Sequence, residues 1–215
     1  QAVQEIVDHD VTTTASAPQA IPLLAEAYAR SGKLHIPLKV LASGGTSVPK
    51  VLIEQGEAIG VRPCRIYGMT ELPTVTMPCP ADTPRQRLET DGRLAPGVEC
   101  EAVDPETRLP LGLGEEGELR VRGPERMLGY LVREQTSAQI DDEGWFYTGD
   151  LGAVDGDDCV TITGRIKDII NRGGEKFSCR DIEDLLVAHP AGAAAAIVPA
   201  PDARFGEVPA AFIVT

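Results

Sequence analysis

LKVLASGGTSVPKVLIEQGEAIGVRPCRIY, residues 38–67, is the stretch that decides the fold class. Its apolar residues predict a strand over 38–42, a helix that opens at Pro49 and ends at Ile59, and a second strand over 64–67. A strand, a helix and another strand in this order are typical of a parallel sheet. Glycine and polar residues follow each strand, at the edge where α/β proteins usually bind ligands.

The pattern on either side of this stretch divides the chain into an α/β part and a β-rich part. Residues 2–8 and 18–30 have apolar residues at helical spacing, and residues 11–14 predict a strand between them. After residue 85 short strands are separated by Gly, Pro and Asp; they are predicted over 98–103, 117–122, 145–147, 151–154 and 159–163. We therefore expect an α/β subdomain over 1–84 and a β-rich subdomain over 85–164, which is a small antiparallel sheet or a distorted barrel.

The last part of the chain predicts a small α+β unit. A strand over 166–170 precedes a helix that begins with an S-x-x-D signal at Ser178 and stops at Pro190. Two more strands are predicted over 193–198 and 210–214. Because the chain stops at a strand, we expect this unit to be incomplete.

Composition excludes several classes of function. The chain has 20 Lys and Arg against 33 Asp and Glu, a formal net charge of −13, which is unlike the basic proteins that bind nucleic acid or anionic membranes. No run approaches the ~18 uninterrupted apolar residues that cross a bilayer. Five cysteines without C-x-x-C spacing favour reduced thiols over a disulfide framework or a zinc site. We expect a cytoplasmic protein, and the start at Gln1 without Met indicates a fragment.

Three apparent motifs are better explained by local structure. GLGEEG, residues 112–117, has the spacing of the dinucleotide fingerprint, but a proline-rich loop precedes it and a strand follows it, where binding requires a strand and then a helix. The aspartates within 155–158 lack the Gly and Glu of a calcium loop and fit a hairpin turn. The three histidines, His9, His35 and His189, have no partners at metal-ligand or triad spacing.

Four polar segments remain, each beside predicted strands. They are SGGTSVPK at 43–50, YGMTE at 67–71, YTGD at 147–150 and GRIKDIINRGGEK at 164–176. YGMTE offers an aromatic ring to stack on a base, a hydroxyl for a phosphate and a carboxylate for a magnesium ion. The carboxylate of Asp150 can accept hydrogen bonds from two ribose hydroxyls at once. The fourth segment is basic and rich in glycine, and it crosses between two predicted units.

At these residues the sequence resembles the adenylate-forming, or AMP-binding, superfamily, which includes acyl-CoA synthetases, aryl-acid AMP ligases, luciferases and peptide-synthetase adenylation domains. YGMTE, GELRVRGPERMLGYL, YTGD and GRIKDIINRGGEK occur in the family's order and spacing, and the resemblance covers about residues 38–215. The details are most similar to bacterial acyl-CoA synthetases (fatty-acid–CoA ligases). The resemblance implies part of a large α/β domain with a parallel sheet and a small β-barrel, followed by a truncated α+β domain over 168–215.

SGGTSVPK also resembles the family's phosphate loop, which runs roughly S-G-T-T-G-x-P-K. That loop lies far upstream of YGxTE in the family, whereas Ser43 is 24 positions before Tyr67, and Ser47 stands where the loop has Gly. We therefore identify residues 43–46 as the family's adenine turn. The phosphate loop and the segment with the family's catalytic lysine then lie outside this chain, so we expect it to be inactive alone.

The resemblance implies roles for individual residues. Thr70 and Glu71 are the expected catalytic residues; Thr70 bonds the α-phosphate and Glu71 binds magnesium. The expected nucleotide-binding residues are Gly44, Gly45, Thr46, Tyr67, Gly68, Met69, Asp150 and Arg165. Among them, Tyr67 stacks on adenine, and Asp150 with Arg165 holds the ribose hydroxyls. Lys167 lies in the expected hinge, residues 165–167, and Gly173, Gly174 and Glu175 belong to the loop of the thioester step.

The activity implied by the resemblance is that of an ATP-dependent acid–thiol ligase. A fatty or aromatic carboxylate attacks the α-phosphate of ATP to give acyl-adenylate and pyrophosphate, and the CoA thiol then displaces AMP. ATP, Mg²⁺ and CoA are the expected cofactors and partners. Two alternatives stay open: an aryl-acid AMP ligase that loads a carrier protein, and a non-catalytic nucleotide-binding module of the same fold. The sequence specifies neither the acid nor the oligomeric state.

Overall fold

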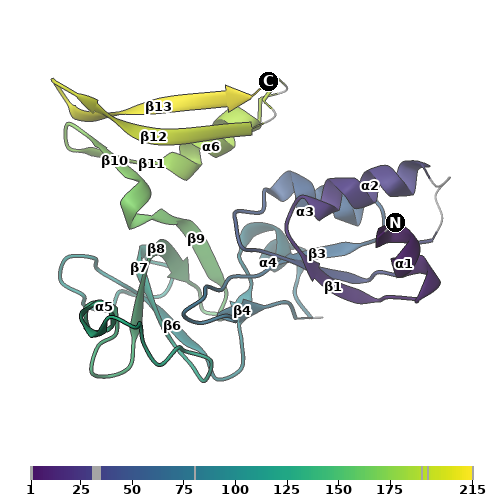
Figure 1. The fold of residues 1–215 in the computed structure, drawn as a ribbon, viewed down its shortest axis with the longest axis horizontal. Coiled ribbons are helices and arrows are strands. Elements are labelled where there is room, and N and C mark those ends of the chain that lie inside the picture. The colour runs from purple at the N-terminus through teal and green to yellow at the C-terminus, as the bar shows by residue number, and fades with distance from the viewer. Residues whose placement is uncertain (1, 31–34, 80, 190, 193, 215) are drawn as a thin grey trace. The chain divides into compact units, whose positions relative to one another are not determined.

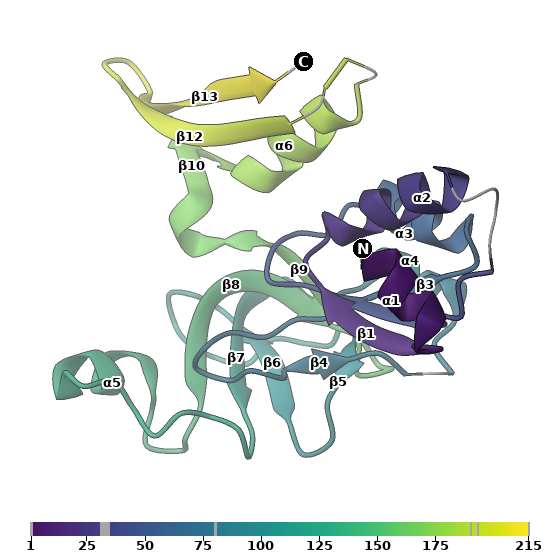
Figure 2. The same cartoon turned by 45° about the vertical axis from the view of Figure 1, so that its right-hand side comes forward.

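The structure is a computed structural model that describes residues 2–30, 35–79, 81–189, 191–192 and 194–214. The chain divides into two compact units. The first comprises residues 1–100, 122–136 and 155–161, and the second comprises residues 101–121, 137–154 and 162–215. Figures 1 and 2 show the helices and strands of both units. No helix within the described ranges has the length and apolarity needed to cross a bilayer.

A parallel sheet of three strands, in the order β1-β2-β3, organises the first unit. Its strands are β1 (Thr13–Ser16), β2 (Val40–Ser43) and β3 (Arg62–Arg65). α2 (Ala20–Arg30) connects the first pair and α3 (Lys50–Glu57) the second; the two helices lie side by side over the sheet (Figures 1 and 2). α1 (Ala2–Asp8) precedes β1. The α/β class with a parallel sheet is confirmed.

The core of this unit lies between the helices and the strands. Ile21 of α2, Leu41 of β2 and Ile53 of α3 are buried together in one cluster. Burying a side chain of this size contributes about 1.5–3 kcal/mol. The strands themselves are displaced by about two residues from their predicted positions, 38–42 and 64–67. Leu38 is an example at β2: it is buried in the core although it lies before the first residue of the strand. Apolar patterning detects burial, and at β2 burial begins before strand pairing does.

A short helix and a small two-stranded sheet in this unit were not predicted. α4 (Pro84–Glu89) has the sequence PRQRLE, which shows no apolar period, and it is fixed by a capping box between Thr83 and Gln86. β4 (Thr76–Met77) pairs antiparallel with β5 (Arg93–Leu94). Leu88 of α4 packs against the core of the unit, but one apolar residue and two-residue strands give no apolar period, so hydrophobic patterning gave no signal for these elements.

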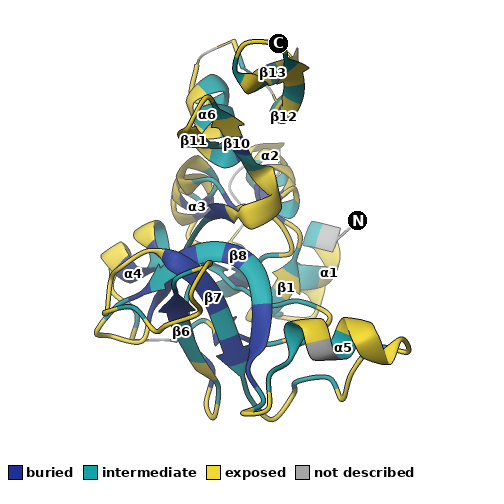
Figure 3. Ribbon diagram, turned by 90° about the vertical axis from the view of Figure 1, so that its left-hand side faces the viewer, coloured by how far each residue is buried: buried dark blue, intermediate teal, exposed yellow. Residues whose placement is uncertain are grey.

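The β-rich part is a four-stranded sheet in the order β6-β7-β8-β9. Its strands are β6 (Glu99–Val103), β7 (Gly117–Arg122), β8 (Phe146–Val154) and β9 (Val160–Arg165). β7 and β8 pair antiparallel, and Figure 3 shows buried positions along both. The strands predicted over 145–147 and 151–154 are a single strand, β8, which corrects the sequence-based division. α5 (Arg133–Gln139) is polar and was not predicted.

The small α+β part of the second unit has a sheet in the order β11-β10-β13-β12. Its strands are β10 (Ile169–Arg172), β11 (Glu175–Ser178), β12 (Ala194–Asp202) and β13 (Gly206–Val214). α6 (Cys179–Val187) packs against β12, with Ile170, Cys179 and Ile197 in the core. The helix start at Ser178 is confirmed, whereas the predicted stop at Pro190 and the predicted strand residue Ala193 lie outside the described residues.

The segment that leads into this sheet differs from its prediction. Ile166–Asp168 form a 3₁₀ helix, η1, and the strand begins only at Ile169, so the strand predicted over 166–170 is wrong in its first half. All three residues of η1 are exposed. Because Ile166 is exposed and these residues form a single turn of helix, their main chain does not pair with a neighbouring strand. The order of their residue types nevertheless resembles that of a strand.

Candidate nucleotide-binding site

Two of the candidate segments lie side by side at one edge of the parallel sheet. Gly44 directly follows β2, and Ile66 directly follows β3. The Ile66 N–H donates to the Ser43 carbonyl oxygen at 2.9 Å. A Cβ at Gly44 would lie 2.3 Å from the Ile66 carbonyl oxygen, so only glycine permits this approach. The turn after β2 is therefore in direct contact with the residue that immediately precedes YGMTE.

The next residue of that turn is also suited to a flat ligand. Gly45 has a φ of +82°, a conformation that favours glycine, and a Cβ there would meet no other atom within 4 Å. Gly45 and Thr46 are exposed. The backbone of residues 44–46 is thus held by the contact at Gly44 and open beyond it.

The backbone of Tyr67 is held by residues 75 and 76, and its carbonyl accepts from the Val75 N–H at 3.1 Å. The Tyr67 N–H donates to Thr76 Oγ1 at 2.7 Å, and the Tyr67 carbonyl accepts from the Thr76 N–H at 3.0 Å. Thr76 Oγ1 in turn donates to the Asp91 carbonyl at 2.6 Å. The half-buried Tyr67 is therefore held at its main chain.

Thr70 and Glu71 lie at the tip of a tight turn. The Met69 N–H donates to the Leu72 carbonyl at 3.1 Å, which closes the turn around them. Gly68 precedes it, and a Cβ at Gly68 would lie 2.0 Å from the Pro73 carbonyl oxygen. Thr70 is exposed and Glu71 is half-buried. The turn thus presents a hydroxyl and a carboxylate from neighbouring residues.

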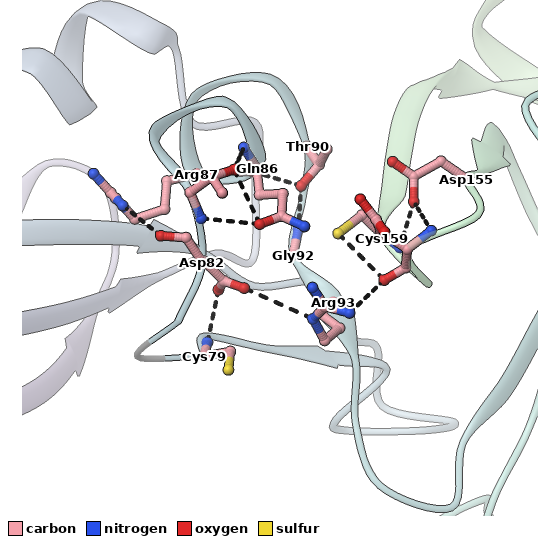
Figure 4. Close-up of polar contacts among 11 residues, drawn as sticks. Cys79, Asp82, Gln86, Arg87, Thr90, Gly92, Arg93, Asp155 and Cys159 are labelled. Atoms are coloured by element: carbon pink, nitrogen blue, oxygen red, sulfur yellow. Dashed lines mark hydrogen bonds and ion pairs between the residues drawn. The ribbon is translucent and has the colours of Figure 1, made fainter.

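A polar network joins helix α4 to the residues that follow it (Figure 4). Thr90 Oγ1 donates to the Gln86 carbonyl at 2.6 Å and accepts from the Gly92 N–H at 3.3 Å. Asp91, which lies between Thr90 and Gly92, provides the carbonyl oxygen that accepts from Thr76 Oγ1. The unpredicted helix α4 therefore supports the backbone on which Tyr67 rests.

Glu71 has a partner that the sequence did not reveal. The Tyr130 hydroxyl donates to Glu71 Oε1 at 2.7 Å, although 59 positions separate the two residues. Burial, with a further contribution from the hydrogen bond to Glu71, raises the pKa of Tyr130 to about 12, so the hydroxyl keeps its proton at neutral pH. Tyr130 lies within the quoted GELRVRGPERMLGYL motif, and its only sequence signal was that position.

Asp150 is presented by a β-bulge. Glu118 pairs with Leu151 and Arg120 with Tyr147, so residues 148–150 of β8 face Leu119 alone. The extra residues bend the strand, a device often found beside functional sites. Gly149 occupies the bulge with a φ of +71°.

Side chains and backbone of both strands hold this bulge. Thr148 Oγ1 donates to the Leu119 carbonyl at 2.8 Å and accepts from the Asp150 N–H at 3.0 Å. The Gly149 N–H donates to Glu118 Oε1 at 3.1 Å. Glu118 is buried, and this burial raises its pKa. Sequence reasoning identified Asp150 but not Glu118, which has no signal beyond its place in β7.

The structure brings Asp150 and Arg165 together. Arg165 Nε donates to Asp150 Oδ1 at 2.7 Å. The Asp150 carboxylate is 5% exposed, whereas the Arg165 side chain is 64% exposed. Lys167 lies two residues later, in the exposed η1. These residues form a second cluster, which belongs to the second unit, whereas residues 44–46 and 67–71 belong to the first.

Gly173 and Gly174 form the turn of a β-hairpin. Arg172 pairs with Glu175 across it, and the two glycines have φ values of +63° and +100°. Such a two-residue turn requires positive φ at both positions. The predicted assignment of Gly173, Gly174 and Glu175 to the thioester step stays a prediction.

The segments set aside from the sequence have local structural explanations. The Gly112 N–H donates to Glu115 Oε2 at 2.7 Å within a turn that leads into β7. Asp155 Oδ1 accepts from the Asp157 and Cys159 N–H groups, as in a hairpin turn. Among the described residues no three His, Cys, Asp or Glu side chains gather as a metal site, and none of the five cysteines forms a disulfide.

Glu71 suits a magnesium ion that is bound together with a nucleotide. Mg²⁺ prefers oxygen ligands and commonly takes one or two carboxylates, with the remaining positions filled by phosphate oxygens and water. A lone carboxylate at the tip of a turn meets that requirement, whereas it would not hold a metal that needs an all-protein cage.

The chain has relatives among known proteins. The AMP-binding enzyme family matches residues 1–131. The chain is 39% identical to the medium-chain fatty-acid–CoA ligase of Escherichia coli (strain K12), over 82% of the chain and 31% of that protein. It is 45% identical to the 4-coumarate–CoA ligase 2 of Oryza sativa subsp. japonica, over 69% of the chain and 27% of that protein. The chain therefore spans about a third of the length of these curated relatives.

Solved structures share the fold. The o-succinylbenzoate CoA synthetase of Bacillus subtilis, in complex with its acyl-adenylate intermediate, aligns with a TM-score of 0.86 and 28% identity, covering 99% of this chain and 43% of that one. ATP-bound MatB of Rhodopseudomonas palustris aligns with a TM-score of 0.85 and 30% identity, covering 98% and 42%. These alignments confirm the predicted fold class.

Proposed function

The chain belongs to the AMP-binding enzyme family, and from this premise we propose that it forms the adenine-, ribose- and magnesium-binding part of an acid–CoA ligase. The contact between Gly44 and Ile66 carries the proposal, because it joins the two segments that would receive the adenosine and the α-phosphate. Ligands of α/β proteins commonly bind at the carboxyl ends of such parallel strands.

In the first step, a carboxylate oxygen of the acid attacks the α-phosphorus of ATP. The bond from that phosphorus to the bridging oxygen breaks, and pyrophosphate leaves. Tyr67 stacks on the adenine, Asp150 accepts from the ribose hydroxyls, and Thr70 donates to an α-phosphate oxygen. These residues position the nucleotide, and positioning together with charge stabilisation provides most of the catalysis in phosphoryl chemistry.

Magnesium fits beside Glu71 and would supply positive charge to the phosphate oxygens. The task of Glu71 is to present its carboxylate at the tip of the Met69–Leu72 turn, next to Thr70. A loss of Glu71 would therefore affect the nucleotide phosphates more than the adenosine.

In the second step, the CoA thiol attacks the acyl carbon of the adenylate. The bond from that carbon to the phosphate oxygen breaks, AMP leaves and the thiol proton passes to solvent. Gly173, Gly174 and Glu175, at the hairpin between β10 and β11, are assigned to this step. Lys167 and the exposed η1 form the hinge before them.

The acid is a fatty or an aromatic carboxylate. A medium-chain fatty-acid–CoA ligase and a 4-coumarate–CoA ligase are both similar to this chain, and the acids that they are named for represent the two classes. An aryl-acid ligase that loads a carrier protein and a non-catalytic nucleotide-binding module are the remaining alternatives.

The test is acid-dependent ATP–pyrophosphate exchange by the protein encoded by the complete reading frame, with octanoate and 4-coumarate as the acids. We expect exchange with one class of acid, followed by thioester formation with CoA. Residues 1–215 alone are expected to give no exchange, because they contain neither the family's phosphate loop nor its catalytic-lysine segment. Thioester formation on a carrier protein but not on CoA would favour the aryl-acid ligase. AMP binding without exchange would favour the non-catalytic nucleotide-binding module.

A further inference from the structure

The loop of residues 127–132 contacts Glu71 at both its main chain and its side chain. The Met127 N–H donates to the Glu71 carbonyl oxygen at 2.8 Å. Three residues later, the Tyr130 hydroxyl donates to Glu71 Oε1 at 2.7 Å. The neighbouring Leu128 and Leu131 are fully exposed, while Tyr130 is half-buried. Within this loop the Tyr130 side chain therefore reaches the Glu71 carboxylate, while Leu128 and Leu131 do not turn inward.

Helix α5 fixes the loop in this arrangement. The Tyr130 N–H donates to Thr136 Oγ1 at 2.8 Å. Gly129 has a φ of +154°, and a Cβ there would lie 2.9 Å from Thr136 Cγ2, so the loop passes close against the helix. Met127, Tyr130, Thr136 and Glu71 all belong to the first unit. The main chain of Tyr130 is thus held by Thr136 of α5, and its hydroxyl is held by Glu71.

The hydroxyl restricts a flexible side chain. A glutamate loses about 1.5–2 kcal/mol of rotamer freedom when it is fixed in one conformation. A hydrogen bond on Oε1 fixes that conformation before a ligand arrives and directs Oε2 to a cation. Hydrogen-bonded partners of metal ligands commonly act in this way, and their loss weakens metal binding about 10–100-fold.

We propose that Tyr130 is a positioning residue that orients the Glu71 carboxylate toward the magnesium ion of the bound nucleotide. The inference rests on the proposed function, because it places Tyr130 behind the magnesium ligand of the same site. Thr136 extends the arrangement by one step, since it holds the main chain of Tyr130. Neither Tyr130 nor Thr136 touches substrate in this account.

The test measures Mn²⁺ binding to the complete protein in the presence of ATP, read by electron paramagnetic resonance of free Mn²⁺. Tyr130→Phe removes only the hydroxyl, and we expect it to weaken Mn²⁺ retention about tenfold. Binding of adenosine, measured by calorimetry without metal, is expected to stay within twofold. Tyr28→Phe, a change of the same kind in α2, is the matched control and is expected to change neither.

A double-mutant cycle separates positioning from a general structural effect. In a Glu71→Ala background, Tyr130→Phe is expected to cause no further loss of Mn²⁺, because the group that it positions is gone. Thr136→Val is expected to weaken Mn²⁺ retention in the same direction and by a smaller factor. An equal loss in both backgrounds, or an equal loss of adenosine and Mn²⁺, would overturn the assignment.

The outcome also separates this inference from the proposed function. If the native protein retains Mn²⁺ with ATP and Tyr130→Phe retains it equally well, the positioning role is wrong and the proposed function stands. If the native protein shows neither ATP-dependent Mn²⁺ binding nor acid-dependent exchange, the proposed function has failed and the inference fails with it.

Discussion

Arg165 Nε lies 2.7 Å from Asp150 Oδ1, which joins the last residue of β9 to the bulge of β8. The bulge places the carboxylate and the arginine holds it, so the two residues act as one polar unit. The pair lies directly before η1, the segment assigned to the hinge. In the proposed function, the pair that binds ribose therefore lies two residues before Lys167 of the hinge.

Asp150→Ala in the complete protein is expected to weaken AMP and adenosine alike, by about tenfold or more. The change removes a charge-assisted acceptor, and such hydrogen bonds contribute about 1.5–3 kcal/mol. Calorimetric titration with AMP, adenosine and free adenine is the measurement. Adenine has no ribose, so its affinity is expected to be unchanged. The exposed Asp142→Ala is the control, and a similar loss in both variants would remove Asp150 from the site.

At neutral pH, Glu118→Gln is expected to have a higher free energy of unfolding than the native protein. This advantage is expected to be smaller at acid pH. Burial raises the pKa of Glu118 above its ordinary value of 4.5, so the folded state favours the protonated side chain. The contribution of the protonated Glu118 side chain to the free energy of unfolding is complete below pH 4.5. It is lost as pH rises through the pKa of the folded state. Glutamine cannot ionise, and its Oε1 can still accept from the Gly149 N–H.

The measurement for this prediction is the Tm of native protein and variant between pH 4 and pH 8. The variant's advantage should grow with pH, while Glu116→Gln, on an exposed residue next to the same strand, should show no such trend. A difference that shrinks as pH rises would contradict the burial argument.

Arg120→Lys is expected to destabilise the fold by about 1–3 kcal/mol, or several degrees in Tm. Arg120 Nε donates to Glu101 Oε1 at 2.7 Å and Nη1 donates to the Tyr147 hydroxyl at 3.1 Å, while the guanidinium lies 4.7 Å from the centre of the Trp145 ring. Lysine can reproduce neither the planar fork nor the stacking. Thermal unfolding gives the value.

Arg122→Lys provides the matched comparison. Arg122 also contacts a glutamate through two nitrogens, at 2.8 and 2.7 Å from Glu99, but both side chains of that pair are substantially exposed. Exposed ion pairs contribute about 0–1 kcal/mol. Equal destabilisation by the two lysine variants would show that burial and stacking at Arg120 have little effect.

Limited trypsin digestion is expected to cut first within residues 165–176. Lys167 lies in the exposed η1, and Lys176 lies just past the exposed Gly173–Gly174 turn. Exposed connecting segments are preferred sites of cleavage. Mass spectrometry of the earliest products identifies the bond, and a first cut within 38–75 would contradict the proposed hinge.

The sequence predicted those parts of the fold that bury apolar residues at regular spacing. The alternation around residues 38–67 identified the parallel sheet because Leu41 and Ile53 lie in its core. The polar helices α4 and α5 were missed, because a capping box and a threonine contact leave no apolar period. The β8 strand was divided in two, since a bulge at Gly149 has the same sequence signal as a turn.

The residues of the candidate site also divide into those that the sequence predicted and those that it missed. Asp150 and Glu71 were found because they lie in short motifs, each with a characteristic order of residue types. Tyr130 and Glu118 were missed as individual residues, because their partners are 59 and 31 positions away. A contact of this length becomes visible only when the strand pairing and the loop positions are known.

The most direct test of the account is titration of ¹⁵N-labelled residues 1–215 with adenosine, followed by NMR. We expect amide shifts at both clusters, residues 44–46 and 67–71 in the first unit and residues 148–150 and 165 in the second, with a dissociation constant of about a millimolar. Stacking of a base contributes about 1–3 kcal/mol, and a millimolar constant corresponds to about 4 kcal/mol. Shifts confined to residues 112–117, around the rejected glycine fingerprint, would show that the nucleotide has been placed in the wrong segment.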